Sequence, residues 1–449
     1  MLKDRLWMKI LAAAAALIVL ALLLYQVPAV HERLAWRVDN AVTRIKYTLN
    51  PPDQAIFIPG EAGPDRTPTL IPPASPTPDQ PTPEAAPEST ERPASPTPAE
   101  TGTPFPEFVK LDGVTYVHQH ERWNYCGPAN LTMALNYWGW PGDRDDVARV
   151  VKPGVNNPDL SFIQRGRTDK NVMPYEMIDF IVEETQFHVV ARYGGNLEVV
   201  KRLIAGGYPV MVEKGYYEED YTGTVAWMGH YLFTTGYDEA AGEFIVQDAY
   251  LEPGKNMRVD YQTYLDGWRS FNYLFLVVYP PDQQDQVYEL LGPWGDPEWS
   301  YTQALETAQE EIQTLSEINL FFAWFNKGTS LVKLQRYLEA AEAYDRAFEV
   351  YSRLESDETQ RPYRIMWYQT WPYMAYYYSG RYQDTLDLAD HTLRETISEP
   401  TLEESLYWRA LAKEALGDVP GAVTDLNRAL TLNQFFDLAA FHLNRIQNQ

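Results

Sequence analysis

Proline content divides this chain more sharply than any other feature of its sequence. Residues 51–106 hold 17 of the 33 prolines, mixed with Thr, Ser, Glu and Ala. Proline fixes φ and lacks a backbone N–H, so neither a helix nor a sheet interior can form there. We therefore predict a disordered, extended, Pro/Thr-rich stalk over 51–106, although a linker with no further purpose has the same composition. It separates a short N-terminal part, 1–50, from a globular part that starts at residue 107.

The N-terminal part contains a long apolar run. Residues 10–30 are almost wholly apolar, and three basic residues precede them. About 20 such residues can cross a bilayer as a helix, and cations before them favour an N-terminus left in the cytoplasm. We predict that 1–50 forms a signal anchor, a transmembrane helix followed by a juxtamembrane helix, in the cell membrane with the later domains extracytoplasmic. Secretion after cleavage near 27–29 is the alternative.

Charge and cysteine content exclude several classes of protein. Lys plus Arg number 37 and Asp plus Glu 62, which gives a formal net charge of −25. Such a balance disfavours nucleic-acid binding, which needs a basic face. With one cysteine, Cys126, the chain can form neither an intrachain disulfide nor a Cys-rich zinc site. Cys126 is therefore either a small buried hydrophobe or a nucleophile.

Cys126 stands at the predicted start of a helix. Pro128 suits the first helical turn, where its missing N–H costs nothing, and Gly139 marks the expected end. Unpaired N–H groups and the helix dipole favour an anion at this position, so a thiolate is stabilised. The position makes a nucleophile as plausible as a structural thiol.

A thiolate nucleophile needs a base, and the chain has seven histidines. His118 and His120 are spaced like a metal pair on a strand, but no carboxylate cluster or second motif accompanies them. His188 lies in a predicted strand and is expected to be structural. We predict no metal site from these residues.

His230 and Asp248 bracket a predicted hairpin. Apolar residues 231–235 indicate one strand, 236–242 a turn, and 244–246 the partner strand. Antiparallel pairing returns the chain, so His230 and Asp248 fall at the same end of the sheet. A carboxylate there can hold an imidazole in one tautomer, although two merely polar residues would fit a hairpin end as well.

Three sequence motifs in this part of the chain carry a family resemblance. CGPA at the predicted helix start, GHYLFTTGYD and VQDAY together resemble the papain-like cysteine peptidases of the bacteriocin-processing (double-glycine leader peptidase) type, in particular their non-transporter relatives. The resemblance covers 107–282 and implies an α+β papain-like fold with the cysteine helix against an antiparallel sheet. It also implies Cys126 as nucleophile, His230 as general base and Asp248 as orienting carboxylate, without metal or organic cofactor.

The same resemblance implies an oxyanion hole. The family places a glutamine commonly six residues before the cysteine, whereas Gln119 stands seven before Cys126 and His120 occupies the usual place. We expect Gln119 to supply the donor together with the Cys126 backbone N–H, and Asn124 to replace it if the loop does not allow this.

The C-terminal part, 283–449, is predicted to be wholly helical and repetitive. Segments 321–352, 366–397 and 403–434 share small and aromatic residues at matching positions, and 437–447 reads as a capping helix. They resemble tetratricopeptide repeats, whose unit is two antiparallel helices. The resemblance implies a surface for a protein partner, while a rigid appendage packed on the peptidase domain is the alternative.

Together these features predict a membrane-anchored, extracytoplasmic cysteine peptidase that hydrolyses peptide bonds of a peptide or protein substrate through a thioester. Two other interpretations stay open at this point. One is an inactive papain-like module whose repeats act as a protein-interaction scaffold. The other is an acyltransferase or amidase with the same Cys-His-Asp triad.

Overall fold

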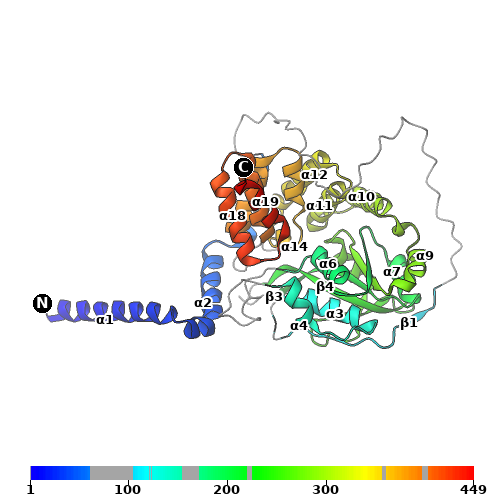
Figure 1. The fold of residues 1–449 in the computed structure, drawn as a ribbon, viewed down its shortest axis with the longest axis horizontal. Helices are drawn as coiled ribbons and strands as arrows, with labels where there is room; N and C mark the ends of the chain where they lie inside the picture. Colours follow the sequence, from blue (N-terminus) through cyan, green and yellow to red (C-terminus); the bar gives the residue numbers. More distant parts are fainter. Residues whose placement is uncertain are drawn as a thin grey trace.

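The structure, a computed structural model, covers most of the chain and shows a mixed α/β region beside a helical region (Figure 1). The described residues are 2–60, 105–120, 122, 124–153, 171–219, 225–355, 361–396 and 403–448. Most of the predicted proline-rich stalk, 61–104, lies outside the described residues.

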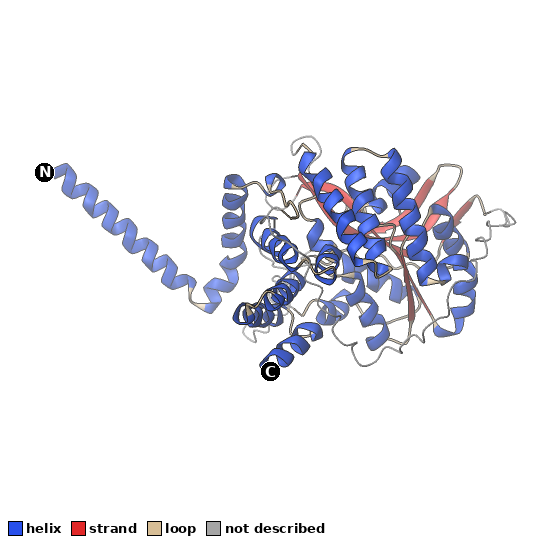
Figure 2. Ribbon diagram, turned by 90° about the horizontal axis from the view of Figure 1, so that it is seen from above, coloured by secondary structure: helices blue, strands red, loops and turns tan. Residues whose placement is uncertain are grey.

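The N-terminal part forms two helices, α1 (Leu2–Tyr25) and α2 (Pro28–Leu49). Helix α1 projects away from the rest of the molecule in both views (Figures 1 and 2). Pro28 occupies the first turn of α2, so the apolar run predicted as one span is divided between two helices. Within the described part of the chain, no helix has both the length and the apolar character needed to cross a membrane.

Residues 51–60 pack on the helical region, so the prediction of a disordered stalk is wrong for this segment. Phe57 is buried, and its ring centroid lies 5.0 Å from that of Phe348 and 6.3 Å from that of Tyr376. The backbone N–H of Gly60 donates a hydrogen bond to Asp384 Oδ1 at 2.9 Å. Burial of the Phe57 ring stabilises the packed position of this segment. The proline-rich composition of 51–106 did not reveal this contribution.

The mixed α/β region is built on antiparallel strands. Its elements, in chain order, are β1 (Phe108–Lys110), α3 (Cys126–Tyr137), α4 (Arg144–Val151), α6 (Pro174–Glu184), β2 (His188–Arg192), α7 (Leu197–Ala205), β3 (Val210–Glu219), β4 (Val225–Asp238), β5 (Glu243–Asp248), β6 (Met257–Asp260), α8 (Tyr261–Arg269) and β7 (Phe275–Tyr279). The strands form one sheet in the order β2-β7-β3-β4-β5-β6, with β1 paired to β4.

Each face of this sheet carries its own hydrophobic core. Successive side chains of a strand point to opposite faces. Tyr231 and Phe233 of β4 therefore pack on the side of α3, with Leu131 and Leu135, while Leu232 packs on the side of α7 and α8. The cysteine helix thus lies against an antiparallel sheet, as predicted.

The helical region follows. Its helices are α9 (Gln284–Leu291), α10 (Pro297–Thr314), α11 (Glu317–Lys333), α12 (Tyr337–Arg353), α14 (Ile365–Tyr368), α15 (Trp371–Tyr378), α16 (Tyr382–His391), α17 (Glu403–Ala415), α18 (Val419–Leu432) and α19 (Asp437–Gln447). In Figure 1, α10, α11 and α12 lie above the α/β region, whereas α9 lies beside it next to α7.

Three helix pairs share one turn geometry. Gln335, Gly380 and Gly417 occupy the matching positions between the paired helices, and all three have positive φ values, 58°, 79° and 91°. Close helix packing also needs a small residue: a Cβ added to Gly328 would lie 2.7 Å from ring atoms of Tyr344. The predicted repeat pattern therefore corresponds to recurring backbone geometry.

The helical region packs directly on the α/β region. Asn326 Nδ2 donates to the carbonyl oxygen of Arg269 at 2.7 Å, and Asn272 Nδ2 donates to Ser330 Oγ at 2.9 Å. All four residues are buried. The two amide Nδ2 groups thus find acceptors across this interface, which offsets the cost of removing them from water.

Candidate active site

Cys126 is the first residue of α3 and is 6% exposed. The helix is fastened to β4 by Asn130, which is fully buried. Its Nδ2 donates to the carbonyl oxygen of Cys126 at 2.9 Å and to that of Tyr231 at 3.0 Å. Because Tyr231 follows His230, this side chain ties the backbone at Cys126 to the backbone next to His230.

His230 and Asp248 come together on neighbouring strands. His230 Nε2 lies 2.9 Å from Asp248 Oδ1, and both side chains are buried. Oδ1 also accepts hydrogen bonds from the backbone N–H of Tyr250 at 2.8 Å and of Leu251 at 3.0 Å. These bonds hold the carboxylate in place against the ring.

The hairpin is longer than predicted. The sequence indicated that His230 begins its strand, but β4 already begins at Val225, because residues 225–229 continue the pairing with β3. Asp248 does end β5. His230 therefore sits within a continuous ladder, which restricts its backbone more than a strand end would.

The third contact joins His230 to Cys126. Each side chain shifts the pKa of the other, so the two groups lie close together. Since Asp248 engages Nε2, Nδ1 is the ring nitrogen left for the thiol. The structure thus brings Cys126, His230 and Asp248 into one connected group.

The electrostatics of this group favour a thiolate beside an imidazolium. Burial by itself lowers the pKa of His230, but the charge and hydrogen bond of Asp248, with Cys126, raise it to about 9. Burial raises the pKa of Cys126, and the His230 contact and nearby backbone N–H groups outweigh this, so the pKa is lowered. The pKa of Asp248 is also lowered, mainly by His230 against the effect of burial.

Two aromatic rings flank the imidazole. The ring centroid of Tyr216 lies 5.5 Å from that of His230, and the ring centroid of Tyr250 lies 6.4 Å away. Both rings limit solvent at His230, which strengthens its interaction with Asp248.

Gln119 lies beside the turn that follows Asp248. Its backbone N–H donates to the carbonyl oxygen of Ala249 at 2.7 Å, and its side-chain oxygen is buried without a hydrogen-bond partner among the described residues. Asn124 adopts a left-handed conformation, with φ of 47°, two residues before Cys126. The oxyanion role expected for Gln119, with Asn124 as its substitute, stays a prediction.

His118, His120 and His188, the other histidines considered from the sequence, make contacts of their own. The ring centroids of His118 and His120 are 5.4 Å apart, and His120 Nε2 lies 3.3 Å from Glu252 Oε1. His188 Nδ1 forms a hydrogen bond with Gln284 Oε1 at 3.1 Å. These contacts agree with structural roles.

Two charged residues near the group were not singled out from the sequence. Glu213 and Lys214 are consecutive in β3 and lie opposite Tyr231 and His230. Burial first, then the charge of Cys126, raise the pKa of Glu213 well above its usual value. The charge of Lys214 helps to lower the pKa of Asp248. The sequence did carry a signal, since two consecutive charged residues directly follow the apolar residues 210–212 within β3.

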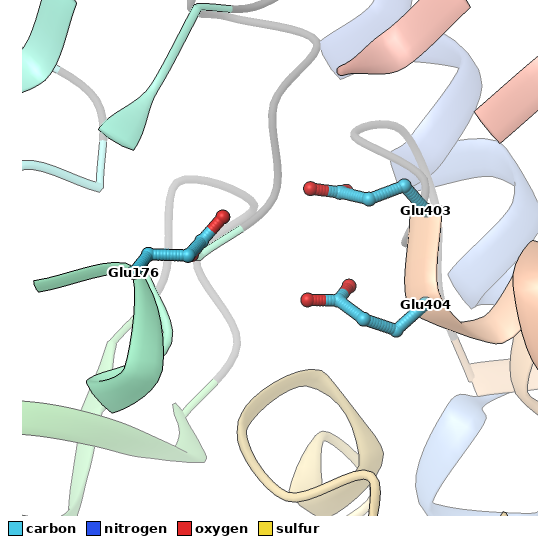
Figure 3. A group of neighbouring side chains, drawn as sticks. All are labelled: Glu176, Glu403 and Glu404. Carbon is cyan, nitrogen blue, oxygen red and sulfur yellow. The ribbon is translucent and has the colours of Figure 1, made fainter. Parts of the chain in front are cut away.

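One cluster of carboxylates has the spacing of metal ligands. Among the described residues, Glu176, Glu403 and Glu404 offer oxygen atoms that all lie within 4.8 Å of one another (Figure 3). Glu176 comes from α6 and the other two from α17, so the cluster spans the two regions. Tyr175 donates a hydrogen bond to Glu404 Oε1 at 3.0 Å. None of its members belongs to the group formed by Cys126, His230 and Asp248.

Comparison with known proteins agrees with this geometry. Residues 111–275 match the model of the Peptidase_C39 like family, which confirms the predicted resemblance. The match supports a peptidase, which is a hydrolase that acts on a peptide or protein substrate. None of the curated proteins compared matches the chain.

Two solved structures are similar to part of it. One is the peptidase domain of Streptococcus ComA, a bifunctional ABC transporter involved in a quorum-sensing pathway, with 15% identity, 37% of this chain and 98% of that chain covered, and a TM-score of 0.27. The other is xylellain, a cysteine protease from Xylella fastidiosa, with 14% identity, 39% and 87% covered, and a TM-score of 0.27.

Proposed function

From the family match and the buried Cys126 group, we propose that this chain is a cysteine peptidase that hydrolyses peptide bonds through a thioester acyl-enzyme. The observation that carries the proposal is the bond between His230 Nε2 and Asp248 Oδ1, which leaves Nδ1 for the thiol. An imidazole held in this way can first stabilise the thiolate and later donate its proton.

The proposed reaction has two steps. The Cys126 thiolate attacks the peptide carbonyl carbon, and the resulting oxyanion is stabilised by the Cys126 backbone N–H and by Gln119 or Asn124. His230 protonates the leaving amine, which departs as the thioester forms. His230 then takes a proton from water, the water attacks the thioester, and the carboxylic acid leaves with the thiolate restored.

The proposal also includes a helical-repeat domain that binds a protein partner and an N-terminal membrane anchor. The matching left-handed turns at Gln335, Gly380 and Gly417 support tetratricopeptide-like pairs that bind a protein partner. The apolar run of the sequence, with exposed side chains such as Leu17 and Leu23 on α1, supports an N-terminal anchor in the cell membrane, with cleavage and secretion as the alternative.

The first experiment uses the lone cysteine. Alkylation of the full chain by iodoacetamide is followed from about pH 5 to pH 9, in the wild type and in His230→Ala. We expect fast reaction well below pH 8 in the wild type and its loss in the variant, because the imidazolium stabilises the thiolate. Cys126→Ala serves as the unlabelled control.

Reaction that rises only above about pH 8.5 in both proteins would mean an ordinary thiol and would contradict the proposal. If the thiolate is activated, incubation with a peptide library and mass spectrometry of the products separates hydrolysis from acyl transfer. Hydrolysis leaves a free carboxylate, whereas acyl transfer joins the acyl group to a second amine.

A further inference from the structure

Tyr368 of the helical region lies against the strand that carries His230. A Cβ added to Gly229, the residue before His230, would lie 2.7 Å from Tyr368 Cδ1. The Tyr368 ring is therefore in contact with the backbone of Gly229, a contact that only glycine permits. The ring centroids of Trp227 and Phe271 lie 5.6 and 6.0 Å from that of Tyr368 and meet it edge-on.

The segment around Tyr368 is held on both of its sides. Gln369 is buried, and its Nε2 donates to the carbonyl oxygen of Ser270 at 2.6 Å. On the other side, Trp367 packs with Met173 in a small apolar cluster that Tyr368 also contacts. Residues 367–369 thus contact β4 and Ser270 on one side and Met173, the residue before α6, on the other.

Met173 links this cluster to the cysteine helix. Its neighbour Val172 packs on the first turn of α3, since a Cβ added to Gly127 would lie 3.0 Å from Val172 Cβ. Tyr368 is therefore connected to both parts of the site, to Gly229 beside His230 and, through Trp367, to the turn that begins with Cys126.

The Cys126 group is closed to solvent in this arrangement. Cys126 is 6%, His230 3% and Asp248 0% exposed. Burial raises the pKa of Tyr368, the nearby Arg364 opposes this, and the charge of Cys126 adds to it, which agrees with a ring close to the thiol.

We propose that the ring of Tyr368 shields Cys126 from solvent on one side, and that it thereby restricts which groups reach the thiolate. The proposal rests on the proposed peptidase function and adds that the helical region completes the site. The α/β region then does not select its substrate alone, because a side chain about 240 residues further along the chain narrows the approach to the nucleophile.

The test compares alkylating reagents of one chemistry and two sizes. Iodoacetamide and an iodoacetamide that carries fluorescein react with Cys126 in the full chain at about pH 9.5, where any accessible thiol is largely ionised. We expect Tyr368→Ala to react about ten-fold faster than wild type with the large reagent, and to gain less with the small one, because the ring no longer blocks local access. Tyr368→Phe keeps the ring and should react like wild type.

Tyr378→Ala is the matched control, since its ring is 56% exposed on α15 and should leave both rates unchanged. Thermal melting of each variant identifies any that fails to fold. If Tyr368→Ala does not fold, Gln369→Leu decides the question, because it keeps the ring but removes the hydrogen bond to Ser270, and it should also raise the rate with the large reagent.

Equal rates in wild type and in the folded Tyr368 or Gln369 variant, with both reagents, would overturn the inference. This outcome is distinct from failure of the proposed function, which shows in the dependence on pH and on His230. If the thiol reacts slowly without activation by His230, but reacts faster in Tyr368→Ala, the peptidase proposal fails and the proposal that Tyr368 shields Cys126 stands.

Discussion

Asp248 Oδ1 lies 2.9 Å from His230 Nε2 while it also accepts two backbone hydrogen bonds from the turn that follows it. The backbone N–H groups of Tyr250 and Leu251 therefore hold the carboxylate in place independently of its contact with the imidazole. The ring cannot rotate without breaking a buried charge-assisted bond, so Nε2 stays engaged and Nδ1 stays free of Asp248.

Replacing this carboxylate should disable the site without unfolding it. Asp248→Asn keeps the shape but removes the charge that holds the imidazolium, so the rate of Cys126 alkylation at about pH 6 should fall, and peptide hydrolysis should fall about 100- to 10,000-fold. Alkylation that is quenched at a series of times and quantified by mass spectrometry measures the rate at Cys126. Asp238→Asn, which alters a carboxylate paired with Arg258 at the far end of β4, is the control and should leave both rates unchanged.

The pH dependence of hydrolysis should have an alkaline limb set by His230. The reactive pair needs Cys126 ionised and His230 protonated, and the pKa of His230 is raised to about 9. Activity should therefore persist through neutral pH and fall as the pH rises through about 9. In Asp248→Asn the limb should move to lower pH, because the charge that raises the pKa of His230 is gone. A limb at the same pH in both proteins would assign it to another group.

Glu213 should make the protein less stable as the pH rises. Its pKa in the folded state is raised well above the ordinary value of 4.5, so the folded state holds a proton that the unfolded state releases above that pH. The cost of keeping this carboxyl buried starts near pH 4.5 and grows as the pH rises towards the folded pKa. Glu213→Gln should remove the cost and raise Tm by about 2–4 °C at pH 8, and by less at pH 4.5.

The matched control for Glu213 is Glu339→Gln, on the surface of α12. The pKa of Glu339 is lowered by Arg336, so this carboxylate makes the folded protein more stable, not less, as the pH rises. Differential scanning calorimetry from pH 4.5 to about pH 8 measures both variants. An equal Tm gain for Glu213→Gln at every pH would mean that the carboxyl is not protonated in the fold.

Phe57 should anchor residues 51–60 on the helical region. Removing a buried phenylalanine side chain costs about 3–5 kcal/mol, so Phe57→Ala should release this segment while the helices stay folded. Hydrogen exchange of the Gly60 backbone N–H, which donates to Asp384, reports the release. Ile58→Ala is the control, since Ile58 is 46% exposed, and slow exchange in both variants would contradict the assignment.

Local patterns predicted much of this molecule. The start of α3 at Cys126 followed from Pro128 and the apolar residues behind it, because these signals act within one helical turn. Three helix pairs followed from the repeated segments, and each pair has a residue with positive φ in its turn: Gln335, Gly380 and Gly417. Strand limits were less predictable: β4 begins before His230 because β3 pairs with residues 225–229, and that pairing is not visible in either strand alone.

Having a single cysteine settles from the sequence alone which thiol a cysteine mechanism could use, and the hairpin order indicates which histidine and carboxylate accompany it. Tertiary packing settled the rest: Glu213 and Lys214 beside the group, Tyr368 against Gly229, and Phe57 on the helical region. These contacts join residues far apart in the chain. Burial of a side chain depends on which surfaces meet after folding, and a local pattern carries no record of the partner surface.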